Sequence, residues 1–298
     1  MKTGIYKHKI VRDLAWVLTS PPLLQPADAT IHWPAPEWYV QQFAASASLL
    51  TKLDSNPAEL QHFLDAKKDR RLGAYYESLW HYWLQQNNRY DVLHKNLQIH
   101  AQQRTIGEFD LLIHDRQSAQ TQHWELAIKF YLGTGDTYQL SNWHGPRLND
   151  NFSKKYHALT SKQIKLAAHP ASKAYLQQAD INIDSTRILL QGRLFYPRQQ
   201  QMVLPQHACS AHQHSWWCDS TLFNDTYPAS TTRVQILEKP DWLTPAWNTS
   251  TESLSVTELV SHVETLGHPC YVIVHDKEID ESGFVVPLRW QRAAQESL

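Results

Sequence analysis

The chain has 298 residues, 42% of them apolar and 19% charged, so it can bury a sizeable hydrophobic core. A formal net charge of −1 gives no general excess of positive charge, so any nucleic-acid groove has to be local. The three cysteines, Cys209, Cys218 and Cys270, argue against a disulfide framework and favour a reducing, cytoplasmic location. No apolar run reaches the roughly 20 residues of a membrane span, and no secretion signal is evident, so we expect no membrane association.

Helical patterns fill the first part of the chain. Residues 10–53 look helical, with a break at the proline-rich run SPPLLQPADA. In SNPAEL, Asn56 can cap a helix, Pro57 suits its first position and Glu59 can reach back to the cap. A long helix, or two in tandem, should then run to about Gln86, with Glu77 at the edge of its apolar stripe. That stripe has helical spacing and comprises Leu72, Tyr76, Leu79, Trp80 and Trp83.

Three strand-like segments follow at about 90–100, 108–114 and 122–131, and their short linkers predict an antiparallel meander. In the third segment, pleating places Glu125, Ala127 and Lys129 on one face and Trp124, Leu126, Ile128 and Phe130 on the other. In the second segment, Asp110 points away from the face that carries Phe109, Leu111 and Ile113. We therefore expect Asp110 to face Glu125 and Lys129 across neighbouring strands.

These residue types suit phosphodiester cleavage. The reaction needs a hard divalent cation, held by a few carboxylate oxygens with room left for phosphate, which is the normal way of binding Mg²⁺. Asp110 and Glu125 are the predicted metal ligands, and Glu77 from the preceding helix would complete the coordination. Lys129 would orient the attacking water and offset negative charge in the transition state. Taken singly, each residue has an alternative interpretation as part of a turn or of a surface ion pair.

A glycine-rich loop then leads into a basic helix at about 152–168. In the functional interpretation Arg147, Lys154 and Lys155 line a nucleic-acid groove and meet phosphate oxygens, and the amide of Gln163 joins them. A solvated helix face explains any single lysine equally well.

The last third begins with the strand-like run RILLQGRLFYP. The run PQHACSAHQHSWWCDS carries His207, Cys209, His212, His214 and Cys218, which could bind Zn²⁺ but match no common zinc spacing. A helix in SVTELVSHVETLG, ending at Gly267, and strands in CYVIVHD and GFVVPLRW complete the chain.

At the level of motifs, the runs RLGAYYESLW, GEFDLLI and HWELAIKFYL resemble the core of the PD-(D/E)XK nuclease superfamily, over about 71–166. The wider pattern resembles an uncharacterised bacterial family catalogued as domain of unknown function 1853, over about 33–290. It is supported by HGPRLNDNFSKKYHALTSKQIKLA, LLQGRLFYP and EKPDWLTPAW. The superfamily resemblance implies Mg²⁺-dependent cleavage of DNA or RNA, with Mn²⁺ as the alternative cation. It also implies that a polar residue, here Gln163, lies near the metal cluster.

One position departs from that pattern. The superfamily places a lysine two residues after the strand glutamate, where this chain has Ala127, and Lys129 follows two residues later. Two residues of strand rise displace the ammonium by about 7 Å. A long side chain recovers part of that distance.

The expected fold is α/β, a restriction-endonuclease-like core with a mixed central sheet flanked by helices. We expect a helical N-terminal extension (1–54), the nuclease-like core (55–197) and an α/β C-terminal elaboration packed on it (198–298). The first functional hypothesis is a Mg²⁺-dependent nuclease with catalytic residues Glu77, Asp110, Glu125, Lys129 and Gln163. The alternative is an inactive nuclease-fold protein that binds nucleic acid or a protein partner. Both are compatible with a homodimer.

Overall fold

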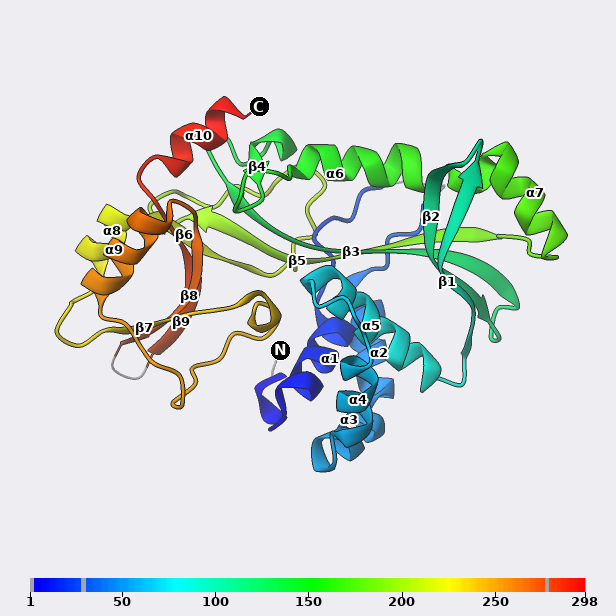
Figure 1. The fold of residues 1–298 in the computed structure, drawn as a ribbon, viewed down its shortest axis with the longest axis horizontal. Helices are drawn as coiled ribbons and strands as arrows, with labels where there is room; N and C mark the ends of the chain where they lie inside the picture. Colours follow the sequence, from blue (N-terminus) through cyan, green and yellow to red (C-terminus); the bar gives the residue numbers. More distant parts are fainter. Residues whose placement is uncertain (1–2, 28–30, 277–278, 298) are drawn as a thin grey trace. The chain divides into compact units, whose positions relative to one another are not determined.

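A computed structural model describes residues 3–27, 31–276 and 279–297. The chain folds as a mixed α/β protein with a large central mixed sheet flanked by helices (Figure 1). By its internal contacts it forms two compact units. Unit 1 contains residues 1–128 and 155–191, and unit 2 contains residues 129–154 and 192–298. The three-part organisation expected from the sequence stays a prediction about domains.

Unit 1 begins with helices that match the predicted helical region. They are α1 (Lys9–Thr19), α2 (Pro36–Ala45), α3 (Ala47–Ser55), α4 (Ala58–Asp65) and α5 (Leu72–Gln85). Asn56 accepts a hydrogen bond from the Ala58 N–H at 3.2 Å, as its predicted capping role requires. Glu59 does not reach back to the cap, because its carboxylate accepts a hydrogen bond from the Tyr82 hydroxyl at 3.1 Å. This hydrogen bond joins α4 to α5. Of the two predicted arrangements, one long helix or two in tandem, the structure has two helices in tandem.

The meander that follows consists of β1 (Tyr90–Ala101), β2 (Arg104–Asp115) and β3 (Gln120–Gly133), paired antiparallel in chain order. After it come β4 (Trp143–His144), α6 (Phe152–Ala158), a π-helical turn (Leu159–Gln163), a 3₁₀ turn (Leu166–Ala168) and α7 (Pro170–Gln178). The predicted basic helix at 152–168 is therefore interrupted by the π turn. Such a turn in a helix is frequently found at functional sites.

The remaining elements are β5 (Ser185–Pro197), β6 (His214–Asp219), α8 (Ser220–Thr226), β7 (Arg233–Ile236), α9 (Val256–Leu266), β8 (Cys270–Asp276), β9 (Ile279–Val286) and α10 (Trp290–Glu296). Among the described residues, nine strands form one sheet in the order β1-β2-β3-β5-β6-β9-β8-β7, and β4 pairs with β3. The sheet is mixed because β6 runs parallel to β5 and β9, whereas the neighbours of β2 and β8 are antiparallel. Strands β3 and β5 pass through both units.

An aromatic cluster joins α5 to the meander in unit 1. Trp80 of α5 lies edge-on to Trp124 of β3, with ring centroids 6.1 Å apart, and Tyr90 of β1 contacts the same indole at 5.3 Å. Trp38 of α2 stacks on Trp80 at 6.1 Å. Burial of such large rings is a major source of stability. It fixes α5, which carries Glu77, against β3, which carries Glu125.

A smaller apolar cluster joins the meander to the helices after it. It contains Ile99, Phe109, Leu112, Leu166 and Leu176. Strict alternation would place Phe109 and Leu112 on opposite faces of β2. Both belong to the same cluster, so the side chain of Phe109 departs from that alternation. The departure falls where the pairing of β2 with β3 ends, at Leu111↔Trp124.

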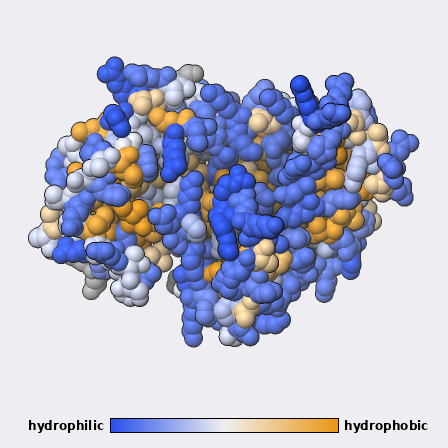
Figure 2. Space-filling view, in the orientation of Figure 1, coloured by the Kyte–Doolittle hydropathy of each residue, from blue (hydrophilic) through white to orange (hydrophobic). Residues whose placement is uncertain are grey.

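Unit 2 has its own core, in which α8 and α9 pack on β6 to β9. The predicted helix ends are confirmed here. Ser255 and Glu258 form a capping box at the start of α9, and Gly267 ends it with a left-handed φ of 70°. Hydrophilic residues dominate the face seen in Figure 2, where apolar residues appear as separate groups.

Candidate active site

The centre of the candidate site is a pair of carboxyl groups on neighbouring strands of unit 1. Glu125 of β3 is 1% exposed. The β2–β3 ladder ends at Leu111↔Trp124, one residue before Asp110 and Glu125 would oppose each other. Beyond that point, Oδ2 of Asp110 accepts the N–H of Leu126 at 2.8 Å. The side chain therefore replaces the next backbone bond, and the Asp110 carboxyl is held beside Glu125, as the pleating predicts.

Burial makes ionisation of both carboxyl groups costly. Burial, together with the neighbouring Glu125 charge, raises the pKa of Asp110 to about 7. Burial also raises the pKa of Glu125, which reaches about 7 even though the Lys155 charge and a hydrogen bond from Asp110 lower it. Because the two carboxyl groups are coupled, they titrate as a pair that holds a proton near neutral pH.

The segment after β4 supplies two polar side chains to the pair. Nε2 of Gln163, in the π turn, donates a hydrogen bond to Oε1 of Glu125. Oε1 of the same amide accepts a hydrogen bond from Nζ of Lys155 in α6 at 3.4 Å. The Lys155 charge also lowers the pKa of Asp110. The predicted proximity of Gln163 to the acids is thus seen in the structure, and Lys155 joins the same network.

His123 was not expected from the sequence. It lies two residues before Glu125, and its Nε2 is 3.6 Å from Oε2 of Glu125. Its side chain is fully buried, and neither ring nitrogen has a hydrogen-bond partner among the described residues. Burial lowers the His123 pKa to about 4, so the ring is neutral at neutral pH. Strand alternation places His123 on the same face of β3 as Glu125 and Lys129. The sequence pattern could therefore have identified His123 as a neighbour of Glu125.

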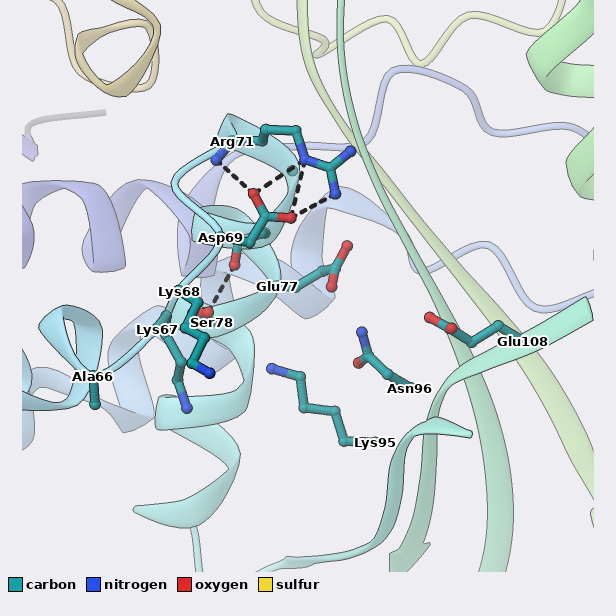
Figure 3. A pocket seen from close by; sticks show the side chains of 12 residues that line it. Ala66, Lys67, Lys68, Asp69, Arg71, Glu77, Ser78, Lys95, Asn96 and Glu108 are labelled. Atoms are coloured by element: carbon teal, nitrogen blue, oxygen red, sulfur yellow. Dashed lines mark hydrogen bonds and ion pairs between the residues drawn. The ribbon is translucent and has the colours of Figure 1, made fainter. Parts of the chain in front are cut away.

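Glu77 of α5 lines a pocket of unit 1. The pocket has a volume of about 610 Å³, and Figure 3 shows the Glu77 carboxylate with Asn96, Lys95 and Glu108 around it. Burial raises the pKa of Glu77, the Asp110 charge raises it further, and a hydrogen bond from Asn96 lowers it. Asn96 itself has a left-handed φ of 51°, which is uncommon for a residue other than glycine. Because it contacts the half-buried Glu77, Asn96 is a further candidate that sequence patterns do not reveal.

The three predicted acids do not assemble as one cluster. Within the described ranges, no group of three or more His, Cys, Asp or Glu side chains is placed to hold a metal ion. The packing gives a reason, because α5 packs on the Trp124 face of β3, whereas Glu125 alternates to the other face. The Glu77 charge interacts with both carboxyl groups of the pair.

The donor set of the pair itself fits a hard cation. Oε2 of Glu125 is buried without a hydrogen-bond partner among the described residues. A buried carboxylate oxygen in that state is costly, and a bound cation would relieve the cost. The adjacent Asp110 offers a second carboxylate of the kind that Mg²⁺ and Mn²⁺ prefer. The fit supports two protein carboxylates as the core of a metal site.

The strand lysine has a different environment. Ala127, at the position where the superfamily has its lysine, is buried at 5% exposure. Lys129 belongs to unit 2, where its Nζ forms an ion pair with Asp150 at 2.6 Å. The catalytic role predicted for Lys129 stays a prediction. In unit 1, Lys155 supplies a positive charge that acts on both carboxyl groups.

The other predicted binding residues are distributed between the units. Arg147 and Lys154 belong to unit 2, and Arg147 lines a pocket of about 450 Å³ with Trp242 and Tyr271. Lys155 belongs to unit 1. The shared nucleic-acid groove stays a prediction.

The histidine and cysteine run in unit 2 is built into the structure by packing and hydrogen bonds. Nδ1 of His212 pairs with the Cys209 carbonyl at 2.7 Å, and Nε2 pairs with the Tyr196 hydroxyl at 3.0 Å. Cys218 belongs to the hydrophobic core of unit 2.

Fold and site together define a mixed α/β protein with a buried pair of carboxyl groups at the end of an antiparallel ladder. The chain belongs to the family described as Domain of unknown function (DUF1853), which matches residues 12–275. No curated protein and no solved structure gives a significant match. Across the described residues, no helix has the length and apolar character needed to cross a membrane.

Proposed function

We propose that this protein is a Mg²⁺-dependent phosphodiesterase that cleaves DNA or RNA, built on a restriction-endonuclease-like core. One observation carries the proposal: Asp110 and Glu125 lie together in a buried site, and the Gln163–Lys155 pair is hydrogen-bonded to Glu125. Buried acids with strongly raised pKa values and defined partners are typical of functional sites. Burying ionisable groups costs free energy, so a purely structural core would be more stable with apolar side chains at these positions.

Each side chain has a defined part in this proposal. Asp110 and Glu125 would hold the cation, which when bound neutralises charge on a phosphate and favours attack at phosphorus. Gln163 fixes the orientation of Glu125 through Oε1, leaving Oε2 available. Lys155 places an ammonium where it can contact a non-bridging phosphate oxygen and offset negative charge that develops there. Lys155 thereby supplies the positive charge that the superfamily pattern places at the position of Ala127.

Glu77 and His123 have supporting parts. The Glu77 charge raises the pKa of Glu125 and interacts with Asp110, so it makes the site more attractive to a cation. His123 is neutral and sits 3.6 Å from Glu125, so it contributes no competing positive charge. Because the His123 pKa is lowered to about 4, the ring stays neutral at any pH above about 4.

A second candidate function is non-catalytic binding of nucleic acid or a protein partner. Two observations favour it: Ala127 replaces the strand lysine, and Lys129 is engaged with Asp150. This candidate predicts binding without turnover in any divalent cation.

The test is incubation of the purified protein with single- and double-stranded DNA and RNA in Mg²⁺ or Mn²⁺. We expect cleavage by the wild type, loss of cleavage in EDTA and loss of cleavage in Asp110→Ala. The control is Asp184→Ala, because Asp184 is a surface acid of unit 1 that accepts the Thr121 N–H at 2.8 Å. Cleavage that persists unchanged in Asp110→Ala would contradict the proposal. Binding without cleavage would favour the second candidate.

A further inference from the structure

The pocket beside Glu77 contains an unusual concentration of lysine side chains. Lys67 and Lys68 come from the segment between α4 and α5, and Lys95 comes from β1 (Figure 3). None of these three ammonium groups forms an ion pair with a carboxylate among the described residues. Lys67 instead lies over the Phe63 ring, with Nζ 4.1 Å from the ring centroid. The pocket therefore brings together three positive charges, none of which forms a close ion pair among the described residues.

The lysines are close enough to oppose one another. Burial lowers the pKa of Lys95 and the Lys67 charge lowers it further, whereas the Glu77 charge raises it. The same two lysines help to lower the pKa of His81 to about 4, although burial is the main cause. Clustered like charges cost free energy in the unliganded protein, and a bound anion would recover that cost.

The acids of the pocket offset only part of this charge. Asp69 is engaged by Arg71, whose Nε donates to both carboxylate oxygens and whose Nη2 donates to Oδ2. Glu77 accepts the Asn96 amide, and its charge interacts with Lys95 and with Asp110 of the carboxylate pair. Glu108 lines the pocket beside Asn96 (Figure 3). The pocket thus has a basic part at Lys67, Lys68 and Lys95, and an acidic part at Glu77 and Glu108.

We propose that Lys67, Lys68 and Lys95 form a phosphate subsite that holds a substrate strand next to the point of cleavage. The inference rests on the proposed function and names a part of the substrate that this unit would bind. A phosphate fits because it carries the charge that three ammonium groups attract and has several oxygens to share among them. A volume of about 610 Å³ has room for a phosphate with an attached nucleoside. Asn96 connects the two parts, since it lies next to Lys95 in β1 and hydrogen-bonds Glu77.

Binding to a short single-stranded oligonucleotide tests the subsite without turnover. The measurement is fluorescence anisotropy in the Asp110→Asn background without divalent cation, so that cleavage does not interfere. The variant is the double substitution Lys67→Gln and Lys95→Gln. The matched control is Lys173→Gln, which removes one exposed charge on α7 of the same unit. Melting temperatures show whether each variant is folded.

We expect the double substitution to weaken binding about tenfold and to lower the slope of log Kd against log salt by about 1, with little change for the control. Oligonucleotides with a 5′-phosphate, a 3′-phosphate or neither distinguish the sources. A tenfold loss that requires one terminal phosphate assigns the subsite to that end, and an equal loss with all three assigns it to an internal phosphate. Unchanged binding by a folded double variant would overturn the subsite, as would equal affinity for polyglutamate.

These outcomes are separate from those of the cleavage test. Loss of binding in the double variant, together with no cleavage by the wild type, would keep the subsite and reject the nuclease. Cleavage by the wild type, together with unchanged oligonucleotide binding in the double variant, would support the nuclease and reject the phosphate subsite.

Discussion

Gln163 donates a hydrogen bond from Nε2 to Oε1 of Glu125, across 38 positions of sequence. The contact joins the π turn after α6 to the strand that carries the strongest metal-ligand candidate. Oε2 of Glu125 has no hydrogen-bond partner among the described residues, and Nε2 of His123 lies 3.6 Å from it. One amide therefore determines which carboxylate oxygen is available for a ligand.

Replacing this amide with an apolar side chain of similar size should reduce activity. In Gln163→Leu, Oε1 of Glu125 loses its donor, so the carboxylate is less well oriented and the pKa of Glu125 rises further. We expect kcat/KM for cleavage to fall about 10²-fold, which is typical for loss of a positioning contact in an active site. Gln163→Glu also removes the donor and should be at least as damaging. Near-normal activity in both variants would show that the contact has no catalytic part.

Substitution of one member of the carboxyl pair should separate stability from function. Asp110→Asn removes a buried group whose pKa is raised to about 7, so the metal-free protein should gain stability at pH 8. One pKa unit corresponds to about 1.4 kcal/mol, and we expect a gain on the order of 2 kcal/mol because the pair is coupled. Cleavage should be lost. Denaturant unfolding at pH 8 in EDTA measures the gain, and a less stable variant would contradict the assigned cause.

Stabilisation by Mg²⁺ should depend on pH with a defined sign. The folded-state pKa of Asp110, about 7, lies above its ordinary value of 3.8, so its stabilising effect is present at low pH and is lost as pH rises through about 7. A cation needs the ionised form, so added Mg²⁺ should raise the melting temperature strongly at about pH 8 and little at about pH 5.5. The quantity to compare is the wild-type shift minus the Asp110→Asn shift, because titration of His81, whose pKa is set by burial, Lys95 and Lys67, then cancels. An equal shift at both pH values would count against this site.

Lysine substitutions show whether Lys155 or Lys129 supplies the positive charge needed for cleavage. Lys155→Met removes the ammonium that acts on both carboxyl groups, and we expect kcat to fall about 10²-fold. Lys129→Met breaks the ion pair with Asp150 in unit 2 and should have a smaller effect on kcat. Lys165→Met is the control, because Lys165 is exposed in the same segment as Lys155. A larger loss in Lys129→Met would restore the role predicted for the strand lysine.

Gly192 of β5 should tolerate no side chain. Its φ is 144°, and a Cβ atom would lie 1.7 Å from the carbonyl oxygen of Lys129. Gly192→Ala should therefore force β5 away from β3 and destabilise the protein by roughly 3 kcal/mol or more. Gly73→Ala is the matched control, because that position in α5 has no atom within 4 Å of the added Cβ, and helix propensity predicts a gain of up to about 1 kcal/mol. The melting temperatures of Gly192→Ala and Gly73→Ala, measured by thermal unfolding, test both expectations.

Local patterns predicted the elements that build the site. Strand alternation placed Asp110 and Glu125 toward each other because it depends only on backbone geometry. Helical spacing predicted that Trp80 and Trp83 would be buried, and Gly267 predicted the end of α9. These features arise between residues that are close in sequence.

The sequence by itself determined the family, the mixed α/β class and the two strand acids that lie together. The tertiary structure decided which groups surround them. Gln163 of the π turn contacts Glu125, and Lys155 of α6 hydrogen-bonds to Gln163. Glu77 is kept out of the cluster because α5 packs on the other face of β3. Such contacts depend on how distant segments pack, and no local periodicity encodes them.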